Sequence, residues 1–76
     1  MTKAQIEKKW GVTIIDDSYF DGFDRYVKAY RMYSADGCSW ENGLRTIKAV
    51  EEECRKWSDA LLGIKATVEA KKWRAN

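Results

Sequence analysis

The sequence predicts an α+β domain with a short N-terminal helix, a three-stranded antiparallel β-meander, and one long C-terminal helix packed on the sheet. Apolar residues recur every three or four positions between residues 47 and 68, which is the period of one helix face. Two Asp-Gly pairs separate segments rich in β-branched and aromatic residues, a pattern typical of hairpins. The 76 residues contain no proline and no low-complexity linker, so residues 1–76 are expected to form a single small domain.

The first ten residues have the pattern of a capped helix. Thr2 and Gln5 fit the capping box, in which each side chain bonds the other residue's backbone N–H. Ile6 and Trp10 lie four positions apart and therefore share one face. Gly11 supplies the helix end, because glycine enters the left-handed conformation freely. A helix this short must pack on another element to be stable.

Three segments in the middle of the chain indicate strands. Residues 12–15 are mostly β-branched and lie between a glycine and two aspartates, which indicates a first strand. Residues 25–34 alternate between two faces and predict a second strand, and residues 38–40 predict a short third one. Together they predict the meander.

The first hairpin has a turn whose simplest form conflicts with the side-chain pattern. Asp21-Gly22 favours a two-residue type I′ turn. Such a turn would place Phe20 opposite Phe23 and would mix polar with apolar residues on one face further along the strands. We therefore expect a bulge or a wider loop near Ser18.

The region after residue 45 carries the strongest periodic signal in the chain. Thr46 is the expected N-cap, and acidic residues lie early and basic residues late, as the helix dipole favours. Gly63, a poor helix former, marks the expected position of a kink. We expect the apolar stripe to pack on the sheet, with a helix-mediated structural dimer as the alternative. The stripe consists of Ile47, Val50, Cys54, Trp57, Leu61, Ile64 and Val68.

The composition argues against an enzyme. The chain has no histidine, which removes the usual general base and the Cys-His and Ser-His nucleophile pairs. Its two cysteines cannot close a structural zinc site alone. Its five glycines are scattered singly instead of forming a phosphate-binding loop. We therefore expect no catalytic residues, no metal and no cofactor.

The charge and hydropathy patterns bound the cellular setting. The net charge is +2, with an acidic middle and two basic ends. No apolar run follows the first lysines, so we expect no secretory signal, and no stretch reaches the roughly 18 apolar residues of a membrane span. The sequence predicts a cytoplasmic protein with free thiols and no membrane partner.

Residues 16–26, DDSYFDGFDRY, hold four aspartates and four aromatic residues. The spacing of the aspartates does not fit an EF-hand calcium loop, and a turn explains the Asp-Gly pair without explaining the rings. A small sheet cannot bury every ring around a hairpin tip, and exposed aromatic side chains rimmed by charge are typical of protein-binding patches. The candidate partner-binding residues are Tyr19, Phe20, Asp21, Phe23 and Asp24.

A nucleic-acid-binding sheet face is the alternative. Basic residues interleaved with aromatic ones can bind phosphates and stack on bases. At the level of architecture alone, a three-stranded sheet followed by a helix is similar to the sheet-reading DNA-binding domains of one plant transcription-factor type and of some transposon integrases. Against this, alternation divides the cations between two strand faces, and the nearby aspartates would repel phosphate. The candidate residues are Arg25, Lys28, Arg31, Tyr26 and Tyr30.

The favoured hypothesis is a non-enzymatic protein-binding module, monomeric, that acts by occupying a partner's surface. Small, histidine-free, aromatic-rich domains are common among accessory proteins of phages and mobile elements, including inhibitors of host defence. That comparison rests on size and composition alone. Nucleic acid is the alternative ligand, and a dimer through the long helix is the alternative assembly.

Overall fold

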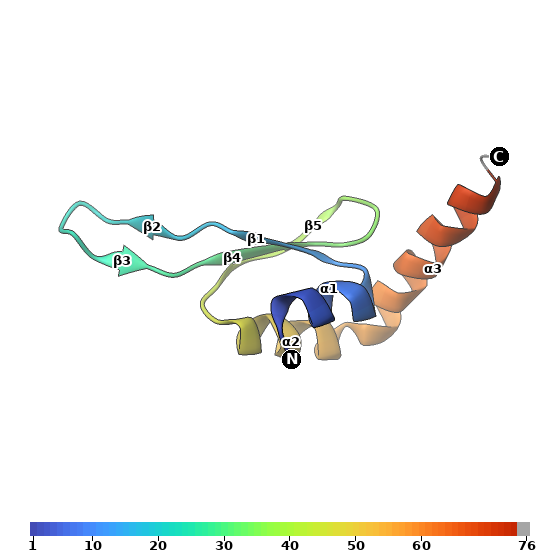
Figure 1. Cartoon of the computed structure of the whole chain (residues 1–76), viewed down its shortest axis with the longest axis horizontal. Coiled ribbons are helices and arrows are strands. Elements are labelled where there is room, and N and C mark those ends of the chain that lie inside the picture. The colour runs from blue at the N-terminus through green and yellow to red at the C-terminus, as the bar shows by residue number, and fades with distance from the viewer. Residues whose placement is uncertain (75–76) are drawn as a thin grey trace.

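The computed structural model describes the backbone of residues 1–74 and the side chains of residues 1–71, and it confirms the predicted α+β class (Figure 1). One helix is followed by five strands and two further helices. The end of the predicted domain, residues 75–76, lies outside the described residues. The elements are α1 (Lys3–Trp10), β1 (Thr13–Asp16), β2 (Tyr19–Phe20), β3 (Tyr26–Val27), β4 (Tyr30–Tyr33), β5 (Ser39–Leu44), α2 (Ile47–Lys56) and α3 (Ser58–Arg74).

Helix α1 forms as its capping signals predict. The Thr2 hydroxyl accepts a hydrogen bond from the Gln5 backbone N–H at 3.2 Å, and the Gln5 side chain accepts one from the Thr2 N–H at 2.8 Å. Gly11 ends the helix in the left-handed conformation, with φ 70°. Ile6 and Trp10 are both buried, so the face predicted from their spacing is the face that packs on the core.

Strands β1, β4 and β5 form the predicted antiparallel meander, in the order β1-β4-β5. Strands β2 and β3 extend the first hairpin beyond this sheet (Figure 1). The register is the same in both parts: Ile14 pairs with Met32 in the sheet, and Phe20 pairs with Tyr26 beyond it. The hairpin therefore continues without an inserted residue.

The predicted irregularity near Ser18 is present, but it is not a bulge. The Asp17 N–H donates to the Ala29 carbonyl at 2.9 Å, as the ladder requires. The Ala29 N–H donates instead to the Ser18 hydroxyl, at 3.1 Å. A side chain thus replaces one ladder bond. This divides the predicted second strand into β3 and β4 without shifting the register.

The hairpin tip is a wider loop and not the two-residue turn predicted at Asp21-Gly22, so the widening expected near Ser18 lies at the tip instead. The Asp21 N–H donates to the Arg25 carbonyl at 2.9 Å, so the loop spans residues 21–25. Phe20 consequently pairs with Tyr26 and not with Phe23.

Strand β5 is longer than the third strand predicted at residues 38–40. Its pairing with β4 shifts between Tyr30 and Met32, and again between Met32 and Tyr33. Gly43 lies in this irregular stretch with φ 70°, the left-handed conformation common in bulges. Because the shifts interrupt the alternation of side chains, the sequence pattern does not indicate the full strand.

The predicted long C-terminal helix is divided into α2 and α3, and the break lies at Trp57 instead of Gly63. Trp57 has φ −108° and ψ 23°, and its ring packs edge-on against Trp40 with centroids 5.9 Å apart. At the next residue, the Ser58 hydroxyl accepts a hydrogen bond from the Trp10 indole N–H at 3.0 Å. These two tertiary contacts stabilise the helix break at Trp57.

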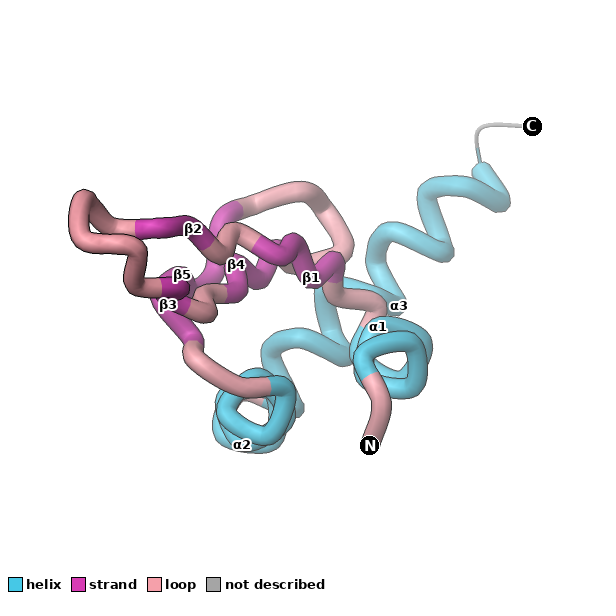
Figure 2. The backbone as a smooth tube through the Cα atoms, turned by 60° about the vertical axis from the view of Figure 1, so that its left-hand side comes forward, coloured by secondary structure: helices cyan, strands magenta, loops and turns pink. Residues whose placement is uncertain are grey.

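The core lies between the sheet and the helices α1 and α2, which cover the same face of the sheet (Figure 2). The first part of the predicted stripe packs there: Val50, Cys54 and Leu61 are buried, and Ile47 packs against them. Trp57 is 43% exposed, and Ile64 and Val68 of α3 are half-buried and lie outside the core, so the prediction that the whole stripe packs on the sheet is wrong for these three residues. Residues of the stripe share the core with residues of α1, so α1 and α2 together cover one face of the sheet. The core residues are Ile6, Trp10, Val12, Ile14, Tyr30, Met32, Val50, Cys54 and Leu61.

The molecule is elongated, with principal extents of 51 × 23 × 17 Å. Its radius of gyration, 14.2 Å, exceeds the about 11 Å expected of a compact chain of this length. The β2–β3 end of the hairpin projects from one side of the core, and α3 projects from the other (Figure 1). Within residues 1–74, none of the helices is long and apolar enough to cross a membrane.

Candidate partner-binding site

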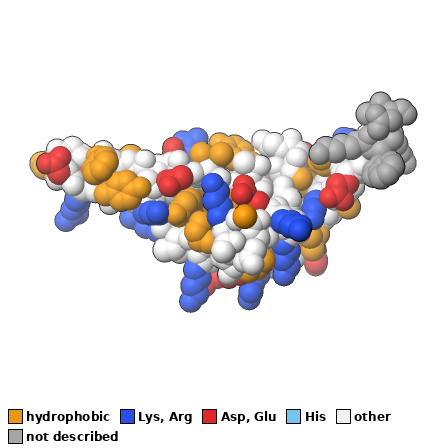
Figure 3. Space-filling view, in the orientation of Figure 1, with side chains coloured by type: hydrophobic (Ala, Val, Ile, Leu, Met, Phe, Trp, Pro, Cys, Tyr) orange, Lys and Arg blue, Asp and Glu red, His pale blue; other side chains and the backbone are white. Residues whose placement is uncertain are grey.

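The outer part of the long hairpin, residues 18–28, projects from the sheet, and we call it the arm. It comprises β2, the tip loop and β3, and the helices that cover the sheet do not reach it (Figures 1 and 2). Its four aromatic side chains therefore stay in solvent. Figure 3 shows hydrophobic side chains gathered at this end of the molecule. The exposed fractions are 54% for Tyr19, 70% for Phe20, 90% for Phe23 and 56% for Tyr26.

Two of these rings form a pair across the arm. The ring centroids of Phe20 and Tyr26 lie 5.2 Å apart, with the planes tilted by 58°, a geometry that stabilises an aromatic pair beyond its buried area. Because side chains alternate along a strand, this pair lies on the face that carries core residues further along the hairpin. Tyr19 pairs with Val27 on the opposite face. The arm therefore presents rings on both of its faces.

The tip loop is held in place by its own backbone and an aspartate. The Asp21 carboxylate accepts hydrogen bonds from the backbone N–H of Phe23 at 3.1 Å and of Arg25 at 3.4 Å. Asp24 has φ 60°, a left-handed conformation that aspartate adopts more readily than most residues. Asp21 thus shapes the loop, and the loop leaves the Phe23 ring in solvent.

The structure brings the predicted partner-binding residues together on one short segment. Tyr19, Phe20 and Phe23 contribute exposed rings, and the two aspartates lie beside them in the loop. The prediction assigned Tyr26 to the nucleic-acid alternative and not to this set. The actual loop length makes Tyr26 the ring that completes the cluster.

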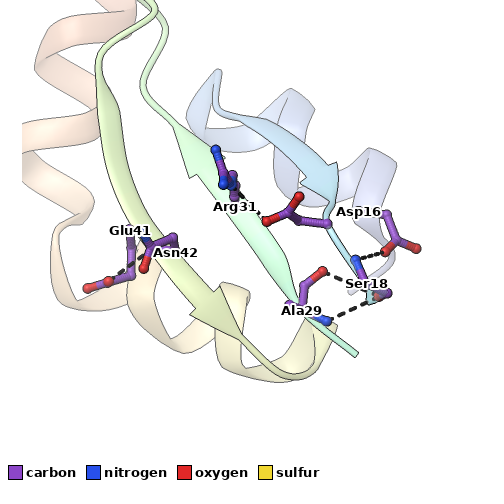
Figure 4. A network of polar contacts seen from close by, with 7 residues as sticks. Asp16, Ser18, Ala29, Arg31, Glu41 and Asn42 are labelled. Atoms are coloured by element: carbon purple, nitrogen blue, oxygen red, sulfur yellow. Dashed lines mark hydrogen bonds and ion pairs between the residues drawn. The ribbon is translucent and has the colours of Figure 1, made fainter. Parts of the chain in front are cut away.

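The outer edge of β1 is blocked by carboxylates of the chain itself. The Ile14 N–H, which points away from β4, donates to Glu7 Oε2 at 3.1 Å. The Ser18 N–H donates to Asp16 Oδ1 at 3.0 Å (Figure 4), and these hydrogen bonds from Ser18 hold the pKa of Asp16 below its usual range. Occupied donors discourage the addition of a partner strand. These two outward N–H groups, in β1 and at the base of the arm, are therefore satisfied within the chain.

The residues of the nucleic-acid alternative do not form one surface. Tyr30 is 7% exposed and belongs to the core. The Lys28 ammonium lies 5.5 Å from the Tyr30 ring centroid. Arg31 points to the other face of the strand, where its Nε lies 2.9 Å from Asp17 Oδ2, and Arg25 lies in the tip loop. The charged ends of Lys28 and Arg31 are thus directed to opposite faces of the strand, as its alternation predicts.

Neither cysteine is activated as a nucleophile. Cys54 is buried, and burial raises the pKa of its thiol to about 11. Cys38 is exposed, and a hydrogen bond with Asp36 raises the pKa of its thiol. The thiolate is the reactive form, so both thiols are slow to react near neutral pH. Among the residues that the structure describes, no three His, Cys, Asp or Glu side chains group together as a metal ion requires.

Comparison with known proteins assigns the chain to no family. No protein-family model, no curated protein and no solved structure matches the chain. What the chain does must therefore follow from the exposure, charge and order of its own side chains. The arm contributes exposed rings and no residue to the core.

Proposed function

We propose that the chain is a non-enzymatic protein-binding module whose arm occupies a surface of a partner protein. The observation that supports this most is the exposure of four rings on a segment outside the core, Tyr19, Phe20, Phe23 and Tyr26. Burying one such ring stabilises a complex by roughly 1.5–3 kcal/mol, and aromatic residues are enriched at interface hot spots. Rings rimmed by aspartates suit a protein surface better than a polyanion.

The arm suits this role because it is ordered before it meets a partner. An isolated two-stranded ribbon is marginally stable in water, but β2 and β3 continue the register of β1 and β4. Ser18 adds a hydrogen bond at the base of the arm, and Asp21 adds one at the tip. A segment that already has its bound shape loses less conformational entropy on association.

The proposed setting is the cytoplasm, where free thiols such as those of Cys38 and Cys54 stay reduced. A module that works by covering another protein's surface needs no catalytic group. Accessory and inhibitor proteins of phages and mobile elements work in this way, and we propose that class for this chain.

Affinity capture from the native host tests the proposal. The tagged chain is compared with the arm variant Phe20→Ser/Phe23→Ser and with Leu62→Ser, which changes an apolar side chain of α3 that is 40% exposed. We expect the Leu62→Ser control to capture the same protein as the unchanged chain, and the arm variant to lose it. Capture of that protein by the arm variant at the same level would refute the proposal.

A further inference from the structure

A basic hollow lies where the arm joins the sheet, on the face turned away from α1 and α2. Its volume is about 220 Å³. Arg31 of β4 and Arg45, which follows β5, line it together with the carboxylate of Asp17, and Tyr19 of the arm forms part of its wall. Lys28 also lines the hollow, but its ammonium lies over a tyrosine ring of the core. The hollow is therefore continuous with the outer face of the arm.

The irregular end of β5 places Arg45 in this hollow. The pairing of β5 with β4 shifts near Gly43, which has φ 70°. Leu44 packs against the core, and because neighbouring residues of an extended chain point to opposite faces, Arg45 lies on the outer face. The Asn42 N–H donates to Glu41 Oε1 at 3.0 Å, which holds the rim of the hollow (Figure 4).

The two arginines differ in how they are paired. The Arg31 Nε–H donates to Asp17 Oδ2 at 2.9 Å (Figure 4), and Tyr33 and Asp17 raise the pKa of the Arg31 guanidinium. The other N–H groups of this guanidinium keep their capacity to donate. Among the side chains of residues 1–71, no carboxylate lies within ion-pair distance of Arg45. The hollow thus contains N–H donors that an acceptor from outside the chain could use.

We propose that the hollow receives a carboxylate side chain of the protein that the arm binds, an inference that rests on the proposed function. A protein surface that covers Tyr19 on the outer face of the arm also covers the hollow, because Tyr19 forms part of its wall. Covering Arg31 and Arg45 with an apolar surface would desolvate two cations without a counter-charge, which opposes binding. A carboxylate supplies that charge and accepts paired hydrogen bonds from a guanidinium.

A protein carboxylate fits the hollow better than the phosphates of a nucleic acid. Asp17 lines the hollow itself. Three more aspartates lie in the same hairpin: Asp16, Asp21 and Asp24. A nucleic acid long enough to lie along the arm would place phosphates beside all four of these charges, whereas a carboxylate seated in the hollow meets only Asp17. The matching partner surface is therefore apolar over the rings and acidic over the hollow.

An NMR titration of the full chain tests this inference. Hexaglutamate peptide is added while the side-chain N–H signals of arginine are followed, and hexaglutamine serves as the uncharged probe. We expect saturable changes at Arg31 and Arg45 with hexaglutamate and none with hexaglutamine. Arg45→Gln should weaken hexaglutamate binding by about fivefold or more, as the loss of a charge-assisted pair implies. Arg55→Gln, which removes an exposed arginine of α2, should leave the affinity unchanged.

Three results would overturn the inference. The first is the absence of saturable changes at both arginines, and the second is a loss of affinity in Arg55→Gln equal to that in Arg45→Gln. The third is tighter binding of a short DNA duplex than of hexaglutamate, with the steep salt dependence of phosphate contacts, which would assign the hollow to nucleic acid.

The arm variant separates this inference from the proposed function. Phe20→Ser/Phe23→Ser keeps the hollow, so it should still bind hexaglutamate although it loses the captured protein. If Arg45→Gln captures that protein undiminished while the arm variant loses it, the proposed function stands and the inference about the hollow fails. If the arm variant captures the protein and hexaglutamate still binds at Arg31 and Arg45, the arm proposal fails, and the partner assigned to the hollow falls with it.

Discussion

The two halves of the long hairpin share one strand register and lie in opposite environments. In the sheet half, Ile14 and Met32 are paired and 1% and 0% exposed. In the arm, Phe20 and Tyr26 are paired in the same register and on the same face, and they are 70% and 56% exposed. The exposures differ because α1 and α2 cover the sheet half of the hairpin and end before the arm (Figure 2).

On the proposed function, this difference separates stability from binding within a single hairpin. The apolar side chains of the sheet half stabilise the fold, whereas those of the arm keep their apolar area available for another surface. Substitutions in the sheet half should therefore change the free energy of unfolding, and substitutions in the arm should change partner binding. The following predictions test that division in order of expected size.

Met32→Ala should give the largest loss of stability. The Met32 side chain is 0% exposed, and its Sδ lies 3.4 Å from the Cys54 Sγ in the core. Truncating a buried methionine leaves a cavity and costs about 2–5 kcal/mol of unfolding free energy, measured by urea denaturation. Met32→Leu, which nearly keeps the volume, is the control and should lose less than about 1.5 kcal/mol. Equal losses in the two variants would contradict the burial of this position.

Gly11→Ala tests how α1 is held over the sheet half. Gly11 has φ 70°, and an added Cβ would lie 2.8 Å from Cγ of Lys65. The Lys65 ammonium donates to the carbonyls of Lys8 and Lys9 at 2.9 and 3.4 Å, so displacing it also loosens α1 from α3. Backbone strain of this kind costs about 1–3 kcal/mol, which a lower Tm would report. An unchanged Tm would mean that α1 is held without this contact.

Ser18→Ala acts at the joint between the two halves. It removes the hydroxyl that accepts from the Ala29 N–H, and losing such a bond costs about 1 kcal/mol. Hydrogen exchange should become faster at the Ala29 and Val27 amides and stay unchanged at Met32. Ser39→Ala, at an exposed serine of β5, provides the control. Faster exchange across the whole sheet would contradict an arm that opens independently of the core.

Phe23→Ala should have the smallest effect on stability. Its ring is 90% exposed, and exposed substitutions of this kind usually change the free energy of unfolding by no more than about 0.5 kcal/mol. The same substitution should nevertheless weaken capture of the partner, because an exposed ring at the tip is a hot-spot candidate. A large loss of stability would place this ring in the core and would contradict the division between the halves.

Local signals predicted the parts of the fold that local contacts hold. The capping box of Thr2 and Gln5 begins α1, and Gly11 ends it. Each of these signals acts on the helix turn next to it, so it can be recognised from the local sequence. The strand pattern likewise indicated the meander. The tip loop was harder to define, because Asp24 takes the left-handed conformation that an Asp-Gly turn would assign to the glycine.

Contacts distant in sequence explain what the pattern did not indicate. The spacing of the apolar stripe runs through Trp57 without interruption, yet the helix breaks there because Trp57 meets Trp40 and Ser58 meets Trp10. The same distinction between neighbouring residues and residues distant in sequence applies to the candidate site. Its rings lie within eight residues of sequence, and all but Tyr26 were in the predicted set, whereas Arg45 lies far along the chain from Arg31 and joins it only through the bulged end of β5.

The chain has only two phenylalanines, Phe20 and Phe23, and both lie in the arm. Fluorine NMR of the chain labelled with fluorophenylalanine therefore reports on the arm alone. If the rings form a free binding surface, both signals should shift when water is exchanged for heavy water, and that response should disappear when the captured partner is added. Signals that are insensitive to solvent in the unbound chain would mean that the rings are sealed inside the fold, and the proposed binding surface would not exist.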